Sequence, residues 1–550
     1  MAFDMDIYEF DEKIDLTRYQ CWVLGATFYP PPWTPLFTDL WYAYGRYGMQ
    51  YGPEMMCDVG SHGWDWRIKD GAFYITIDQT SDEEKKTREP MWRERIGAVL
   101  DDPWKFWEDL KAELKQAYDH FIPFDVERAS DIELNIHFWD VWHFTKRMSE
   151  IHFYAMYALG QGNGLFRIVF PELTGIAITD AKFAKLMSGY DNALFQANKG
   201  LAALATRAVK LGLKGLFDTS RSEELLSALE KSQAGREWLK EFQEYLKVYG
   251  LRMTRQLEIA TPTWQEKPSL AITEVKRAMA AGGVDIPEMQ RERLVQEREE
   301  MEREVLAMVP GEQREWFEKL MRCTQASHFY SEDHAFWCEF LGLSLVRRAS
   351  MALGKRFVRA GIMDQYDDTL YLLHHEIAHA AIIQDRIDLH PVVKRRKEEY
   401  EGYLKKVPEM PMIIGDPSKL MGLVAADTVF SVAVAPQVAT PEEVGATVVG
   451  AAGAPGVVEG IARVIMSDAE IDKIQPGDIL VTPFTTPAWT PVFSTIKAVV
   501  TDGGGYLAHA AIVGREYGIP AVVGTMEASR KIKTGDKLRV DGNLLRVYVL

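Results

Sequence analysis

A histidine near the end of the sequence follows three glycines, an arrangement that suits phosphoryl transfer. Residues 501–524 indicate a strand, a glycine loop, a helix and a second strand, with the helix running from near Ala508 to Gly518, before Pro520. His509 would lie in the first helical turn, where free N–H groups and the helix dipole stabilise a phosphate. Neutral imidazole is nucleophilic near pH 7, and its phosphoramidate can pass the group on. We therefore predict that His509 is transiently phosphorylated.

Short β-branched runs separated by turn residues surround this helix. They occupy residues 457–466, 479–483, 498–501, 521–524 and 537–550. The last run is interrupted by Asp541-Gly542, a strong hairpin signal. These strands predict a compact α/β domain over residues 456–550.

The tail from about residue 454 to 550 resembles the mobile phosphohistidine domain of PEP-utilising enzymes, a family that includes pyruvate phosphate dikinase, PEP synthase, rifampin phosphotransferase and phenylphosphate synthase. The matching landmarks are Pro455-Gly456-Val457-Val458-Glu459-Gly460, Gly477-Asp478-Ile479-Leu480-Val481, Trp489-Thr490-Pro491, Gly503-Gly504, His509-Ala510-Ala511-Ile512-Val513, Arg515-Glu516 and Gly518-Ile519-Pro520-Ala521-Val522-Val523-Gly524. The resemblance implies a swivelling β/β/α domain whose active histidine is His509.

Backbone amides beside His509 are the expected phosphate ligands. The predicted phosphate-binding residues are Gly503, Gly504, Gly505 and Ala510. Many family members place a threonine just before the histidine, whereas this chain has Leu507 and Ala508. Thr485, Thr486 and Thr501 are candidates to replace that contact, and each equally suits a turn or a strand.

The rest of the chain predicts a multidomain protein with a mainly α-helical substrate-binding body, followed by the swivelling domain. Residues 1–100, rich in aromatics, glycine and proline, indicate irregular structure with short helices, as the N-terminal part of that body. Residues 101–405 have helical periodicity, as in the apolar positions between Leu186 and Ala208. Residues 406–455 are expected to form a connector and hinge, with the hinge over 436–456. The highly charged run 289–304 indicates a solvated helix or connector.

The phosphoryl donor is expected on another polypeptide. No GxxxxGKS/T loop or ATP-grasp segment is recognisable, and no PEP-binding barrel follows Leu550. A helical body followed directly by the C-terminal domain resembles rifampin phosphotransferase without its ATP-binding module. Phenylphosphate synthase, in which the phosphohistidine and ATP-grasp subunits are separate chains, matches better still. This resemblance implies conversion of phenol, ATP and water to phenylphosphate, AMP and phosphate, with Mg²⁺ and ATP bound mainly by the partner subunit. Another phenol, an alcohol or an antibiotic hydroxyl remains an alternative acceptor, and a non-catalytic phosphocarrier or scaffold is an alternative role.

Acceptor-site candidates come from the body. A phenol must lose its proton as it attacks, so His334 and Glu332 are candidate catalytic residues, with Asp333 beside them. Arg347 and Arg348 could neutralise the transferred group, although salt bridges on the helix surface explain them better. The aromatic-rich segments offer a flat apolar wall for a phenol ring, with Trp33 and His143 as candidates, or else ordinary core packing.

A rival motif and the composition complete the expectations. His375-Glu376-Ile377-Ala378-His379 matches the HExxH zinc pattern, but five loosely defined residues arise easily by chance, so no metal site is predicted.

The net charge of -17, without a basic cluster, argues against nucleic acid as a binding partner. No signal peptide or apolar span is present, which predicts a cytoplasmic protein without a membrane partner. The four cysteines, Cys21, Cys57, Cys323 and Cys338, are expected to be reduced and mostly buried.

Overall fold

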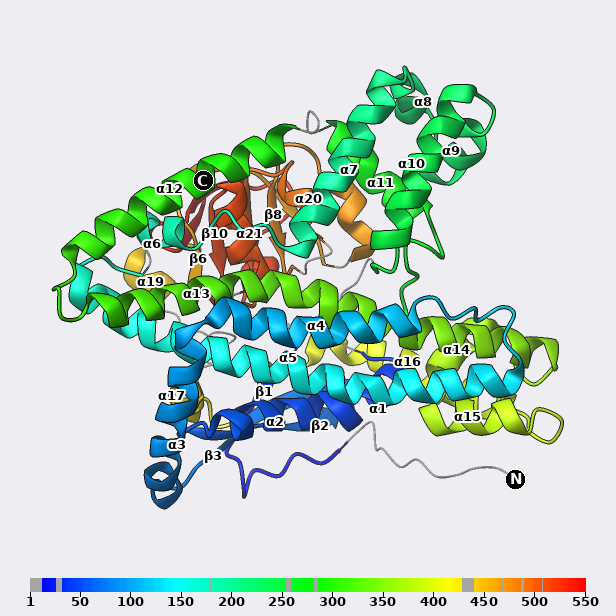
Figure 1. The fold of residues 1–550 in the computed structure, drawn as a ribbon, viewed down its shortest axis with the longest axis horizontal. Helices are drawn as coiled ribbons and strands as arrows, with labels where there is room; N and C mark the ends of the chain where they lie inside the picture. Colours follow the sequence, from blue (N-terminus) through cyan, green and yellow to red (C-terminus); the bar gives the residue numbers. More distant parts are fainter. Residues whose placement is uncertain are drawn as a thin grey trace. The chain divides into compact units, whose positions relative to one another are not determined.

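The computed structural model describes residues 12–25, 32–178, 180–253, 259–280, 285–427, 440–466, 468–485, 489–506 and 508–550. The chain forms two compact units, each assembled from separate stretches of sequence (Figure 1). The N-terminal unit comprises Met1–Ala158, Leu257–Thr261 and Trp337–Thr428. The C-terminal unit comprises Leu159–Gln256, Pro262–Phe336 and Val429–Leu550. The predicted helical body at 101–405 is therefore divided between the two units.

An antiparallel sheet lies in the N-terminal unit, where irregular structure was expected. Its order is β2-β3-β1-β4, from β1 Cys21–Leu24, β2 Ser61–Lys69, β3 Ala72–Gln79 and β4 Ile413–Gly415. The turn between β2 and β3 is Asp70-Gly71, and both residues have positive φ. Asp-Gly is a hairpin signal, but the aromatic composition of residues 1–100 favoured the prediction of irregular structure. Because β4 pairs with β1, part of the predicted connector at 406–455 belongs to this sheet.

Helices make up the remainder of the N-terminal unit. They are α1 Pro35–Leu40, η2 Trp41–Gly45, α2 Arg46–Met56, α3 Asp82–Asp101, α4 Pro103–Phe121, the first part of α5 Asp131–Thr174, α14 Leu341–Arg359, η4 Tyr366–Tyr371, α15 His374–Ile382, α16 His390–Lys406, η5 Val407–Glu409, η6 Pro417–Lys419 and α17 Leu420–Ala426. A complete capping box at Ser81 and Glu84 fixes the start of α3. Among the described residues, no helix is long and apolar enough to cross a membrane.

The C-terminal unit begins with a second helical group. It contains the end of α5, α6 Ala181–Leu186, α7 Ala193–Lys210, α8 Lys214–Thr219, α9 Ser222–Leu229, α10 Gln233–Tyr249, α11 Ser269–Ala280, α12 Asp285–Met308 and α13 Arg314–His334, which continues as η3 Ala335–Phe340 across the unit boundary. The apolar period between Leu186 and Ala208 belongs to two helices, because α6 ends at Leu186 and Asn192 caps α7. The charged run predicted as a solvated helix lies in α12, whose Glu297 and Glu304 pair with Lys185 and Lys182.

An eight-stranded sheet forms the core of the C-terminal domain, residues 440–550. Its order is β5-β12-β11-β7-β8-β9-β10-β6, from β5 Val448–Val449, β6 Ala452–Ala454, β7 Val457–Val464, β8 Ile479–Thr482, β9 Ala498–Thr501, β10 Ala521–Val523, β11 Lys537–Asp541 and β12 Arg546–Val549. Strands β7 to β10 are parallel, and β8 and β9 are buried throughout, as expected for parallel strands covered on both faces. The short helices are α19 Pro441–Val444, η7 Asp468–Lys473, α20 Thr490–Phe493, α21 His509–Tyr517 and α22 Ala528–Lys531.

The domain starts earlier than residue 456. Strands β5 and β6, placed in the predicted connector, pair with β12 and β10 of this sheet, because their short apolar runs supply its two edges. Of the predicted hinge at 436–456, residues 436–439 lie outside the described residues. The predicted hairpin is present as β11 and β12, joined by residues 542–545. The fold is thus multidomain, with a mainly helical body and a β-rich C-terminal domain, as predicted. All four cysteines are free and buried.

Candidate functional site

A tight glycine loop positions His509 at the start of α21. Strand β9 ends at Thr501, whose hydroxyl donates to the carbonyl of Gly503 at 2.7 Å. Gly504 has a φ of 110°, and a Cβ there would lie 2.8 Å from the Cβ of Ala508, so only glycine fits this turn. Helix α21 ends where predicted, with Gly518 in the left-handed conformation.

Two threonine hydroxyls hold the imidazole of His509 from opposite sides of the ring. The Thr485 hydroxyl lies 2.8 Å from Nδ1, and the Thr490 hydroxyl lies 3.1 Å from Nε2. Phe493 contacts the ring edge-on, with centroids 5.4 Å apart. Thr485 was one of the threonines considered from the sequence, whereas Thr490 entered only as part of a family landmark. Thr486 lies outside the described residues.

Burial keeps the His509 imidazole neutral. The residue is 9% exposed, and burial, assisted by the positive charge of Arg252, lowers the pKa of His509 to about 3. A neutral ring retains the lone pair that attacks phosphorus. The side chain is therefore in its nucleophilic protonation state at physiological pH.

Helices of the C-terminal unit pack against the histidine's domain and bring charged residues to it. Helix α20 contacts α11, and α21 contacts α12 and α13. Arg252, fully buried, lies over the ring of Trp264 and donates to Asn198 Oδ1 at 3.3 Å. Glu332, 3% exposed, acts electrostatically on Arg252. Arg252 was not identified from the sequence, where a single arginine in a loop carries no pattern.

Glu516 is a second ionisable residue that sequence reasoning did not single out as a site. Its side chain lies on α21, and burial raises the pKa of Glu516 to about 7, with the charge of Arg515 acting in the opposite direction. A carboxyl group with a pKa near neutrality can exchange a proton at physiological pH.

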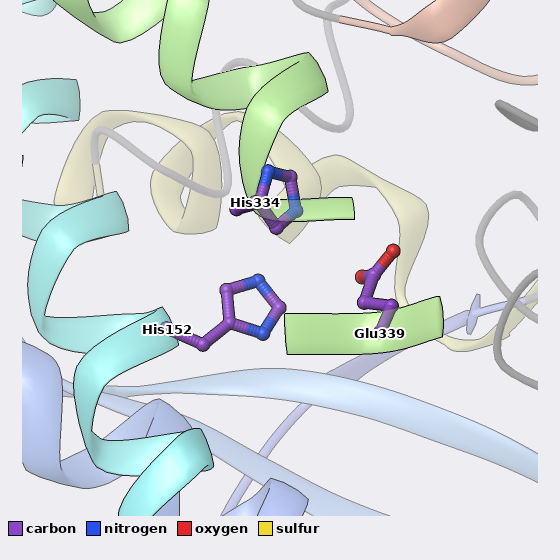
Figure 2. A group of neighbouring side chains, drawn as sticks. All are labelled: His152, His334 and Glu339. Atoms are coloured by element: carbon purple, nitrogen blue, oxygen red, sulfur yellow. The ribbon is translucent and has the colours of Figure 1, made fainter. Parts of the chain in front are cut away.

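The other candidates at the end of α13 have structural contacts. Asp333 accepts a hydrogen bond from the Ala193 backbone N–H at 2.9 Å, at the start of α7. His334 Nδ1 lies 2.7 Å from the carbonyl of Tyr330, one turn earlier in α13, and its ring stacks on Tyr330. Figure 2 shows His334 at the end of this helix. Of the three predicted residues here, Glu332 is the one whose charge acts on Arg252 and so on the surroundings of His509.

The remaining candidates belong to the N-terminal unit. Arg347 donates to the carbonyl of Ile259 at 2.6 Å, and Arg348 donates to the carbonyl of Ile122 at 2.7 Å. Trp33 is 3% exposed and packs against Phe37, Trp66 and Phe73. The ring of His143 stacks on Trp139, and its Nδ1 lies 3.1 Å from the Tyr44 hydroxyl. The two arginines thus bind main-chain carbonyls, and the two aromatic side chains pack against other rings. A role of these four residues in substrate binding stays a prediction.

Within the described residues of either unit alone, no three metal-ligating side chains lie close enough together to bind one ion. His152 and Glu339, both drawn in Figure 2, belong to the N-terminal unit, whereas His334 belongs to the C-terminal unit. In the HExxH segment, Glu376 forms a buried ion pair with Arg396 at 2.5 Å and accepts from the Leu373 N–H at 2.7 Å. A glutamate held in this way is not available to activate a zinc-bound water.

Comparison with known proteins identifies both parts of the C-terminal unit. Residues 474–544 match the family model described as PEP-utilising enzyme, mobile domain, and residues 150–332 match that of the rifampicin phosphotransferase fourth domain. The second match spans Arg252 and ends at Glu332. These matches confirm the resemblance drawn from the sequence motifs.

Three individual relatives match between 20% and 70% of this chain. The uncharacterized phosphotransferase YvkC of Bacillus subtilis (strain 168) is 28% identical over 400 residues, 70% of this chain and 47% of the relative. A rifampicin phosphotransferase of a Streptomyces species is 33% identical over 324 residues, 58% of this chain and 35% of the relative. A probable phosphoenolpyruvate synthase of Pyrococcus horikoshii is 49% identical over 107 residues, 20% of this chain and 13% of the relative. The matched part of this chain spans less than half the length of each relative.

Proposed function

We propose that this chain is the phosphohistidine carrier of an ATP-dependent phosphotransferase and that His509 delivers the phosphoryl group to a hydroxyl acceptor. The observation that carries the proposal is the neutral, buried imidazole held between Thr485 and Thr490. Such a ring is oriented and nucleophilic before the donor arrives, so less reorganisation is needed at the moment of reaction.

The two hydroxyls suit both states of the carrier. When one ring nitrogen forms a bond to phosphorus, its lone pair is used and the threonine on that side loses its contact. The other nitrogen then carries the proton and donates it to the remaining threonine. Arg252, whose charge already acts on His509, stabilises the negative charge of the transferred group.

The donor in this proposal is Mg²⁺-ATP bound by an ATP-grasp partner. A nitrogen of His509 attacks the β-phosphorus, AMP leaves, and water then releases the outer phosphate from the pyrophosphorylated histidine. The hydroxyl of the acceptor attacks the remaining phosphorus, and its proton passes to a base. Glu332 is the first candidate for that base and His334 the second. Because His509 is only 9% exposed, its domain has to move away from the helices to meet the donor.

Phenol is the first proposed acceptor, which gives phenol, ATP and water converted to phenylphosphate, AMP and phosphate. The match of residues 150–332 to the rifampicin phosphotransferase fourth domain favours a second candidate, the hydroxyl of an antibiotic such as rifampicin. In either case the acceptor meets His509 in the C-terminal unit, where Arg252 and Glu332 lie.

A labelling experiment tests the relay. The full chain is mixed with an ATP-grasp protein encoded beside it, Mg²⁺, ATP labelled at the β-phosphate, and either phenol or rifampicin. We expect an acid-labile label on the chain, AMP as the nucleotide product and a labelled ester of one acceptor. His509→Ala abolishes all three, whereas His379→Ala, which alters an exposed histidine in the HExxH segment, leaves them unchanged.

Four results would contradict the proposal in separable ways. Full activity of His509→Ala removes the carrier role, and ADP as product removes the dikinase mechanism. A labelled His509 that is never discharged by either acceptor supports the phosphocarrier alternative. Zinc that is bound stoichiometrically and lost in His379→Ala, together with peptidase activity, would revive the metallopeptidase reading.

A further inference from the structure

A second cationic site surrounds the ring of Tyr506 in the C-terminal unit. The guanidinium of Arg167 lies 4.9 Å from the ring centroid, and that of Arg515 lies 4.4 Å from it. Arg167 comes from α5, and Arg515 comes from α21 of the C-terminal domain. A body helix and the C-terminal domain therefore each bring one positive charge to the same ring, and like charges this close repel each other.

Several buried polar atoms at this site have no hydrogen-bond partner within the described part of the chain. They are Nε of Arg167, Nε of Arg515, the hydroxyl of Tyr506 and both ring nitrogens of His328. His328 meets Tyr506 edge-on, with centroids 5.4 Å apart. Arg515, Tyr506 and His328 are 5%, 6% and 2% exposed. Since buried polar groups almost always have partners, a cluster of unsatisfied donors indicates a missing acceptor.

The electrostatics of the cluster also favour an anion. Burial and the charge of Arg515 lower the pKa of Arg167, and Tyr506 acts in the opposite direction. The carboxylates Glu516 and Glu332 act on Arg515. Burial and both arginines lower the pKa of His328, which leaves that ring neutral and able to donate one N–H. The site thus offers several donors and two guanidinium groups, and the terminal nitrogens of Arg515 already donate to the carbonyls of Gly453 and Tyr506.

A small pocket opens at this cluster. It is lined by Arg167, Ile178, Asp180, Ala184, Ala451, Ala452, Gly453, Pro455, Tyr506, Arg515, Gly542 and Leu545. Its volume is about 40 Å³, and roughly 10–15 Å³ holds one water. Space for a few waters is also the space that a phosphate-sized ion needs. The one acidic residue of the lining, Asp180, is exposed and accepts a hydrogen bond from the Lys182 N–H at 2.8 Å.

We propose that the pocket binds one phosphate-sized oxyanion between Arg167 and Arg515, and that the bound anion latches the C-terminal domain to α5 and α6. Its oxygens accept from the guanidinium groups and the Tyr506 hydroxyl. Binding needs nothing from the phosphoryl relay. The latch rests on the proposed function, because it holds in place a domain that has to move during the cycle. Inorganic phosphate, a product of that cycle, would then slow the departure of the domain.

Calorimetric titration of the full chain with inorganic phosphate tests the binding. We expect one site, weakened about tenfold or more in Arg167→Gln, because a hydrogen bond to a charged group is lost. The matched control is Arg221→Gln, an exposed arginine of the same unit, which leaves affinity unchanged. Asp180→Asn keeps a side-chain oxygen for the hydrogen bond from the Lys182 N–H and removes the negative charge, so phosphate should bind more tightly. Absence of binding, equal affinity in Arg167→Gln, or AMP binding more tightly than phosphate overturns the proposal.

Distances between spin labels test the latch. Cysteines replace the exposed residues Lys533, in the C-terminal domain, and Glu300, on α12, while the native cysteines stay unlabelled because they are buried. Phosphate should narrow the distance distribution in the parent chain and leave that of Arg167→Gln unchanged. An identical response of both proteins overturns the latch. Phosphate binding is also measured in His509→Ala, where it should persist, so that failure of the relay and failure of the anion site give different results.

Discussion

Acid should loosen the C-terminal domain through one side chain, His509. The pKa of this imidazole is lowered to about 3, whereas an exposed histidine in an open chain titrates near 6.5. Between these two values the opened domain binds one more proton than the closed domain. The stability of the closed domain relative to the opened domain therefore falls as the pH falls below 6.5, and it continues to fall until pH about 3.

The size of this effect follows from the linkage between protons and stability. The cost per pH unit is half of about 1.4 kcal/mol at pH 6.5 and approaches about 1.4 kcal/mol below it, so lowering the pH from 6.5 to 4.5 costs about 2 kcal/mol. The change His509→Gln removes the titration and keeps a polar side chain of similar reach. The buried His328 and the carboxyl groups titrate in both proteins, and their effects cancel in the comparison.

Hydrogen exchange followed by mass spectrometry measures the difference. Peptides that cover β8 and β9 report the opening of this domain, and intrinsic exchange rates cancel when parent and variant are compared at one pH. The ratio of parent to variant protection should fall about 50-fold from pH 6.5 to pH 4.5. A ratio that stays constant would falsify the assignment of His509 as a neutral buried base.

Three further variants test the geometry of the site. Gly504→Ala should destabilise the domain more than Gly535→Ala, by at least about 1 kcal/mol in urea unfolding, because both have positive φ but only the Cβ at 504 meets another residue within 4 Å. Thr485→Val should slow label uptake by the active histidine about five- to tenfold in a quench assay, through one lost hydrogen bond; an unchanged rate would count against this contact. Arg252→Gln should slow transfer to the acceptor at least about tenfold and raise the pKa of the histidine, followed by NMR titration.

The backbone around His509 was predictable because its signals are local. The glycines at 503–505 and Gly518 constrain the backbone within a few residues of where they stand, so the bounds of α21 followed from the sequence alone. The alternation of β-branched runs likewise gave the central strands. Strands β5 and β6 were missed because two or three apolar residues among glycines and alanines carry no period, and only pairing with distant strands makes them part of the sheet.

The surroundings of the histidine depended on contacts that the sequence does not encode locally. Arg252 is separated from His509 by more than half of the C-terminal unit's sequence, and nothing in its neighbours marks it as different from the other arginines. The trio at 332–334 illustrates the reverse case. Consecutive residues on a helix point in different directions, so Glu332 acts on Arg252 while Asp333 holds the start of α7.

Helix α21 places two ionisable groups in costly positions on the domain that we propose moves during transfer. His509 has to stay neutral there, and Glu516, with a pKa raised to about 7, is partly ionised at pH 7 in spite of its burial. For Glu516 the sign is opposite to that of His509: its penalty is absent below about pH 4.5 and grows until pH about 7. Both penalties are relieved when the domain leaves the helices. The His509 penalty opposes the packed state below about pH 6.5, and the Glu516 penalty opposes it above about pH 4.5. A contact balanced in this way can hold the imidazole in place and still release it.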